Sequence, residues 1–129
     1  MINLTDNYNL KMQFPIVLPS NWSYKIIYDN NYDHAYDGET TKQYTETEVN
    51  NGVILGIGYS YNDNSINPEI VSSQGILEQI LDSGLFSEVS NGDFYRIKGY
   101  KAKNINGATF TLSDNASTRR HIWIMLYEK

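Results

Sequence analysis

The densest group of side chains suited to binding or chemistry lies in residues 29–38. Two tyrosines, a histidine and several aspartates crowd into this segment, which has no regular hydrophobic period and is therefore typical of an exposed loop. Exposed aromatic rings offer rigid contact area at low entropic cost, and their faces suit sugar rings. Binding residues also concentrate in loops. The sequence therefore predicts a binding edge formed by Tyr32, His34, Tyr36 and Asp37.

The carboxylates of the same loop raise the question of a calcium site, since Ca²⁺ takes oxygen ligands. Asp29, Asp33 and Asp37 recur at every fourth residue, which is not the spacing of an EF-hand loop. A second acidic segment, residues 63–74, has proline where that loop needs glycine. We predict no metal site and no cofactor, while calcium binding by the acidic loop stays open.

The motifs of several enzyme classes are absent. The chain has two histidines and no cysteine, which excludes thiol nucleophiles, disulfides and cysteine zinc sites. It contains no Gly-x-Ser-x-Gly elbow and no Gly-x-x-x-x-Gly-Lys-Ser/Thr phosphate loop, and Gly56-Ile57-Gly58 lacks the third glycine of a dinucleotide loop. The sequence therefore predicts a protein that is not an enzyme.

The charge pattern bears on the kinds of partner. The formal net charge is −5 at pH 7, and the one basic cluster consists of Arg96, Lys98, Lys101 and Lys103. On a strand the first two would share one face and the last two the other. Such a split cluster cannot form a single stripe along phosphates, so we expect no nucleic-acid partner.

No apolar run is long enough to span a bilayer. The first residues also lack the basic start and the apolar segment of a secretory signal. We therefore expect neither membrane insertion nor a signal peptide.

The elements that would position these residues are mostly strands. The length of 129 residues predicts one domain, residues 1–129. Alternation of apolar with polar or small residues predicts strands over 8–14, 22–28, 53–61, 94–105, 108–112 and 121–127, with a weak strand at Gln43–Val49. Asn106-Gly107 suits the turn of a hairpin between the fourth and fifth of these strands. Small residues at Gly56, Gly58 and Ser60 invite close approach by a neighbouring segment.

The last of these strands is apolar on both faces. One face carries Ile122, Ile124 and Leu126, and the other carries His121, Trp123, Met125 and Tyr127. A strand of this kind is usually covered on both sides. We expect a second sheet to cover one face, and we predict that the face with His121, Trp123, Met125 and Tyr127 meets a partner subunit.

One segment predicts a helix. Asn67 is a suitable N-cap, Pro68 fits the first helical position, and Gly84 fits the end. Between them, apolar side chains at helical spacing form a stripe: Ile70, Leu77, Ile80 and Leu81. The predicted fold is therefore mainly β, an antiparallel β-sandwich with one inserted α-helix. The alternative is an α+β fold, an antiparallel sheet with a helix on one face.

Three stretches resemble the C-terminal receptor-binding domains of bacteriophage tail fibre proteins. They are Met-Gln-Phe-Pro-Ile-Val-Leu-Pro-Ser-Asn-Trp at 12–22, the segment 99–112 with Asn-Gly-Ala-Thr-Phe-Thr-Leu, and His-Ile-Trp-Ile-Met at 121–125. The resemblance implies a small β-sandwich that forms a parallel homotrimer at a fibre tip. It also implies location in the virion and adhesion, without catalysis, to a glycan or protein of the bacterial cell surface. Tyr32, His34, Tyr36 and Asp37 would then be the receptor-binding residues.

Two other functions stay open. A small acidic protein of a mobile element could bind and inhibit a host protein in the host cytoplasm. A weaker likeness, carried by Leu-Pro-Ser-Asn-Trp at 18–22, runs to exported α+β domains of the photosystem-accessory and Ran-binding types and implies a bacterial surface or lipoprotein domain. A stable trimer would favour the fibre, whereas a monomer that binds a cytoplasmic target would favour the inhibitor.

Overall fold

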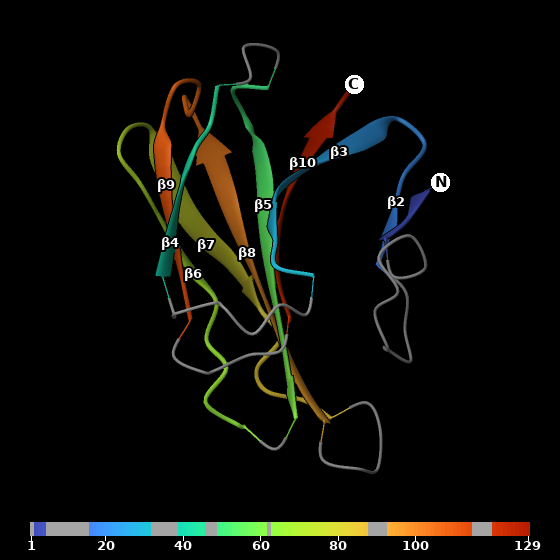
Figure 1. Ribbon diagram of the computed structural model, residues 1–129. Coiled ribbons are helices and arrows are strands. Elements are labelled where there is room, and N and C mark those ends of the chain that lie inside the picture. Colours follow the sequence, from blue (N-terminus) through green and yellow to red (C-terminus); the bar gives the residue numbers. More distant parts are fainter. Residues whose placement is uncertain are drawn as a thin grey trace.

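The computed structural model describes residues 2–4, 16–31, 39–45, 49–61, 63–87, 93–114 and 120–129. All ten of the elements it describes are strands (Figure 1). In chain order they are β1 (Ile2–Asn3), β2 (Val17–Leu18), β3 (Trp22–Asp29), β4 (Glu39–Gln43), β5 (Gly52–Tyr61), β6 (Glu69–Ser72), β7 (Ile76–Asp82), β8 (Asp93–Lys103), β9 (Thr109–Ser113) and β10 (Arg120–Glu128).

The strands form two main antiparallel sheets and one short pair. The larger sheet has five strands in the order β3-β10-β5-β8-β7, and the smaller has three in the order β4-β9-β6. β1 pairs with β2. The fold is therefore mainly β, and the arrangement is consistent with a β-sandwich.

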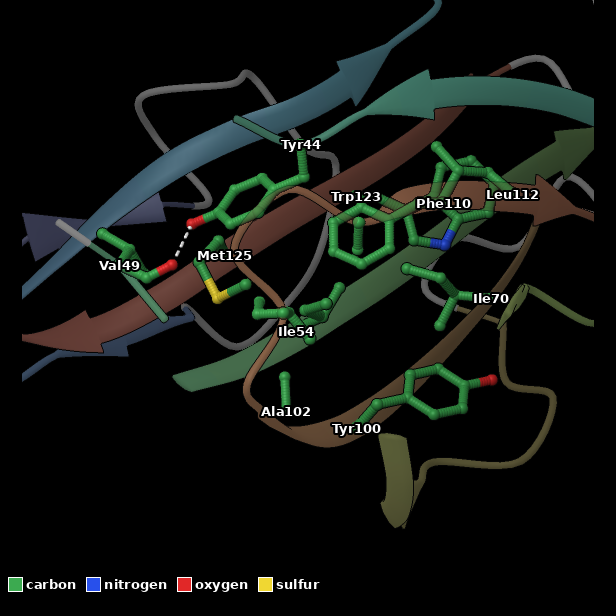
Figure 2. Close-up of a cluster of buried hydrophobic side chains, with 12 residues drawn as sticks. Tyr44, Val49, Ile54, Ile70, Tyr100, Ala102, Phe110, Leu112, Trp123 and Met125 are labelled. Atoms are coloured by element: carbon green, nitrogen blue, oxygen red, sulfur yellow. Dashed lines mark hydrogen bonds between the residues drawn. The ribbon is translucent and has the colours of Figure 1, made fainter. Parts of the chain in front are cut away.

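The core between the two main sheets, here called the inner core, explains why they pack together. Alternate residues of each strand point into it, so Phe110 and Leu112 of the small sheet meet Ile54, Trp123 and Met125 of the large one (Figure 2). All five of these side chains are completely buried. The tyrosine hydroxyl of residue 44 donates a hydrogen bond to the backbone carbonyl of residue 49 at the rim of this core.

A second apolar layer, the outer cluster, covers the opposite face of the five-stranded sheet. Leu4 directly follows β1, and Leu18 is the last residue of β2. Both pack there on Ile57, Ile122 and Ile124. Both faces of the large sheet are thus buried over its centre. This double burial accounts for the long apolar runs of β5 and β10.

The structure corrects the predicted partner interface on the last strand. His121, Trp123 and Met125 have no exposed surface, and Tyr127 is only partly exposed. Their face of β10 points into the inner core, where the three-stranded sheet of the same chain covers it. The opposite face of β10 is covered by the outer cluster. Neither face of its centre is therefore open to a partner, so this strand gives no support to a trimer.

The predicted helix is also wrong, because residues 67–84 contain β6 and β7. Gly75 has a φ of +77° and lies in the connection between these two strands, where glycine adopts a conformation that other residues avoid. The apolar residues of the predicted stripe do not share one buried face: Ile70 is buried in the inner core, whereas Ile80 and Leu81 are exposed. The helical spacing was accidental.

The predicted strands within residues 22–28, 53–61, 94–105, 108–112 and 121–127 are confirmed, while residues 8–14 lie outside the described residues. The hairpin at Asn106-Gly107 is wrong, because β8 and β9 belong to different sheets and do not pair. The positive φ of Gly107, +83°, serves a connection that crosses between sheets. The weak strand predicted at Gln43–Val49 is displaced, since β4 ends at Gln43.

Candidate functional site

The residues predicted to form the binding edge, Tyr32, His34, Tyr36 and Asp37, lie outside the described residues. Asp29 at the start of that loop is described, and its carboxylate is engaged. It receives two hydrogen bonds from the Arg120 guanidinium, at 2.9 and 3.2 Å, and one from the backbone N–H of Asn31 at 2.8 Å. Over the described ranges, no three metal-ligating side chains gather into a group.

A buried polar pair joins the two sheets. His121 of β10 and Asp114, directly after β9, approach to 2.7 Å between Nε2 and Oδ2, and both side chains are fully buried. The other carboxylate oxygen of Asp114 accepts the backbone N–H of Asn67 at 2.7 Å, and the imidazole packs on Trp123. With no exposed surface this histidine cannot reach a substrate, so the pair is structural.

Further charged groups lie at the same end of the molecule. Arg96 of β8 binds Asp82 of β7 in a bidentate arrangement, at 2.7 and 3.0 Å, and also donates to the Ile66 carbonyl. The Arg96 hydrogen bonds lower the pKa of Asp82 to about 2. Burial raises the pKa of Tyr100 to about 12, so it stays a neutral phenol that donates to the Pro68 carbonyl. These contacts hold neighbouring strands and connections together.

A groove lies on the outer face of the five-stranded sheet. Its volume is about 690 Å³, within the range of small-molecule sites. Six of its lining residues come from all five strands, namely Trp22, Val53, Ile80, Lys101, Lys103 and Glu128, and Asn51, Gly52 and Ala102 line it as well. We call these six residues the groove.

The register of the strands explains why these residues meet. Trp22 is paired with Glu128, Val53 with Lys101, and Lys103 with Ile76, and paired residues project to the same face of a sheet. Because side chains alternate along a strand, Lys101 and Lys103 share the face of Ile97, which belongs to the outer cluster. The groove is therefore the open, polar end of that apolar face.

The groove combines an aromatic surface with charges of both signs. Trp22 is partly exposed, and both lysines are exposed. Within the described residues neither Lys101 nor Lys103 takes part in an ion pair. The Glu128 carboxylate instead accepts the side-chain amide of Asn21 at 3.2 Å. A groove with an indole face at one side and such donors and acceptors along it is suited to a polyhydroxylated ligand with a flat apolar side.

Sequence reasoning placed Lys101 and Lys103 correctly on one face of their strand, apart from Arg96 and Lys98, but did not connect them with Trp22. Arg96 and Lys98 are paired with Gly58 and Gly56 on the inner face. The signal for the groove was the polar pair itself: two lysines on the face of the strand that also carries Tyr95 and Ile97. Their distant neighbours followed only from the pairing of the strands.

Strand β7 presents a second exposed feature. It lies at the edge of the five-stranded sheet, and its Ile76, Ile80 and Leu81 are 59%, 53% and 48% exposed. An edge strand with large apolar side chains in solvent is a natural place for another chain to pair.

No helix in the described residues is long and apolar enough to cross a membrane. No protein-family model matches the chain, and comparison with curated proteins and with solved structures likewise gives no match.

Proposed function

We propose that the chain is a non-enzymatic attachment domain of a phage or phage-tail-like particle, which binds a glycan or protein on the bacterial cell surface. In this proposal the two antiparallel sheets are the β-sandwich of the tail-fibre domains that the sequence resembles. The observation that carries the proposal is the groove, because it presents an aromatic face and hydrogen-bonding groups to solvent. Among the described residues, its lining holds no serine, threonine or histidine.

The order of the resembling stretches supports the same proposal. The described part of the first stretch covers β2 and enters β3, the second covers the end of β8 and most of β9, and the third lies in β10. All three therefore fall on or between strands of the antiparallel framework. A homotrimer at a fibre tip in the virion remains part of the proposal, with contacts outside the centre of β10.

The test is binding of the fluorescently labelled chain to intact cells of a panel of bacterial strains. We expect saturable binding to some strains, displaced by excess unlabelled chain and weakened when periodate oxidation destroys the surface sugars. Protease treatment of the cells distinguishes a protein receptor from a glycan. Absence of saturable binding across the panel would contradict the proposal. Light scattering of the purified chain tests the trimer separately, against the monomer mass of 14.8 kDa.

A second candidate, a small acidic protein that binds and inhibits a host protein, is favoured by one observation. The exposed edge strand β7 carries Glu78 and Asp82 among its apolar residues, so it could extend the sheet of another protein. Replacing Ile80 by lysine would block such pairing. If this change abolished a defined protein complex while binding to cells was absent, the inhibitor would be preferred. The α+β surface domain required a helix in residues 67–84, which contain β6 and β7 instead, so it is not proposed.

A further inference from the structure

The geometry points to an acidic oligosaccharide as the ligand of the groove, with the sugar chain lying across the five-stranded sheet and its negatively charged groups on Lys101 and Lys103. This inference rests on the proposed function, since it names the class of glycan that the attachment domain would recognise. The shared chemistry is a sugar polymer that bears carboxylates or phosphodiesters.

The dimensions of the groove favour a chain of sugars over a single ring. Trp22 lies on edge strand β3, and Lys101 and Lys103 lie on β8, three strand positions away in the sheet order. Adjacent strands are about 4.8 Å apart, so the ring and the lysines are separated by roughly 14 Å across the sheet. A ligand that contacts both must extend beyond one sugar ring.

The apolar floor would support the ring faces of such a ligand. Trp22 packs on the outer cluster, and so does Val53, which lies between the indole and the lysines and is the cross-strand partner of Lys101. Ile80, the residue that bulges where the register of β7 shifts, lies on the far side. Sugar rings present apolar C–H faces as well as hydroxyls, so alternating contact with this floor and its polar borders matches their chemistry.

The charges of the groove favour a negative ligand. Lys101 and Lys103 make no ion pair within the described residues, although Glu78 is the cross-strand neighbour of Lys101. The groove's own carboxylate, on Glu128, accepts a hydrogen bond from Asn21 and lies on β10, two strand positions away from the lysines on β8. Because the whole chain has a net charge of −5, attraction of an anion must come from these two local cations and not from the protein as a whole.

The experiment measures the affinity of the full chain for three soluble polymers at physiological salt: oligogalacturonate, which bears carboxylates; poly(glycerol phosphate), which bears phosphodiesters; and neutral dextran. We expect binding to one or both of the acidic polymers and none to dextran. The two acidic polymers distinguish the source of the charge. Equal affinity for dextran, or no binding to either acidic polymer, would overturn the inference.

Variants then locate the site. The double variant Lys101→Gln/Lys103→Gln is expected to weaken acidic-polymer binding by about tenfold or more, equivalent to about 1.4 kcal/mol. Lys25→Gln is the matched control, because Lys25 is paired with Met125 and so lies on the opposite face of the same sheet. It removes one charge and is expected to change affinity by less than about twofold. An equal loss in the control and in the single variants Lys101→Gln and Lys103→Gln would indicate nonspecific attraction and overturn the inference.

The aromatic contact is tested by a pair of substitutions at Trp22. Trp22→Phe retains a ring face, whereas Trp22→Leu retains apolar bulk without one. Once circular dichroism confirms that both variants fold, we expect Trp22→Leu to lose more affinity than Trp22→Phe. Equal affinities of the two folded variants would rule out the stacked ring.

The failure of this inference is distinguishable from failure of the proposed function. Saturable binding to cells that is unchanged in the double lysine variant would contradict the acidic-glycan site and leave the attachment function intact. Conversely, the unmodified chain could bind an acidic polymer through the two lysines and yet bind no cell of the panel. The ligand inferred for the groove would then be correct, and the attachment function would be wrong.

Discussion

Replacing Gly58 with alanine tests whether close packing of the inner core requires a residue without a side chain at this position. A Cβ atom added there would lie 2.5 Å from the Cγ2 methyl of Ile66 and 3.0 Å from the Asp114 carboxylate. Ile66 is only 1% exposed, and the Asp114 side chain is fully buried. Neither neighbour can swing into solvent, so the new methyl group must displace packed atoms.

The size of the effect follows from two opposing contributions. Carbon atoms prefer separations of about 3.5–4.0 Å, so the Ile66 methyl must retreat by roughly 1 Å. Overpacking of this kind typically costs about 1–3 kcal/mol. Alanine recovers about 0.5–1 kcal/mol, because glycine loses more conformational freedom in a strand. Because both neighbours are buried, the overpacking cost is expected near the upper end of its range, about 3 kcal/mol. After the gain of about 1 kcal/mol, we expect Gly58→Ala to lower the free energy of unfolding by about 2 kcal/mol.

The assay is urea unfolding followed by tryptophan fluorescence, together with the melting temperature. The entropy of unfolding is about 2.1 cal/mol/K per residue, so for 129 residues a loss of 2 kcal/mol corresponds to a decrease of about 7 °C. Gly99→Ala is the matched control, since its nearest neighbour is the Cβ of Leu81 at 3.1 Å, on an exposed edge strand that can adjust. We expect a change within about 0.5 kcal/mol there. Equal losses in the two variants, or no loss at Gly58, would refute the argument.

Two further predictions concern the polar contacts at the same end of the molecule. Asp114→Ala removes the buried hydrogen-bond partner of His121, and we expect it to lower the free energy of unfolding in urea by about 3 kcal/mol. Asp114→Asn retains an oxygen acceptor and is expected to cost less. An alanine variant as stable as the wild type would contradict the role of the pair. Arg96 lowers the pKa of Asp82 to about 2 in the folded protein. The ionised carboxylate therefore stabilises the fold at pH values above the pKa that Asp82 has in the unfolded chain. This stabilisation is lost as the pH falls from about 5 to 2. Because solvent screens the pair, we expect the unfolding free energies of the wild type and Asp82→Asn to differ by about 1 kcal/mol at neutral pH. This difference should vanish towards pH 2. A difference that does not change with pH would contradict the assignment.

The strands were predictable where the two faces of the chain differ or where both are strongly apolar. β3, β5 and β10 follow from alternation at Trp22–Asp29, Gly52–Tyr61 and Arg120–Glu128. The close approach expected at Gly56 and Gly58 is also confirmed, because Trp123 and Ile66 lie against them. These features depend on local pattern and side-chain size, which the sequence displays directly.

The errors arose where the outcome depends on long-range pairing. Asn67 and Pro68 satisfy the local rules for a helix start, yet the backbone N–H of Asn67 is used by Asp114, 47 residues away. Asn106-Gly107 suits a hairpin turn, but the partners of β9 are β4 and β6. A local signal cannot specify which distant strand supplies the hydrogen bonds.

The groove could not be predicted from the sequence, because it too depends on long-range strand pairing. Its residues lie between positions 22 and 128, and the register of four strand pairs brings them to one end of the sheet. The sequence showed that Lys101 and Lys103 share a face, and that Trp22 begins a strand. It contained no indication that β3 and β8 belong to one sheet.

The position of β9 and β10 has a consequence for biosynthesis. Each of these strands follows both of its sheet neighbours in the chain and inserts between them: β10 between β3 and β5, and β9 between β4 and β6. Until residues 109–128 emerge, β3, β4 and β6 have no partner in the main sheets. The nascent chain therefore carries unpaired strand edges until residues 109–128 have been made. A pause or a break in synthesis before that point would leave these edges open to aggregation.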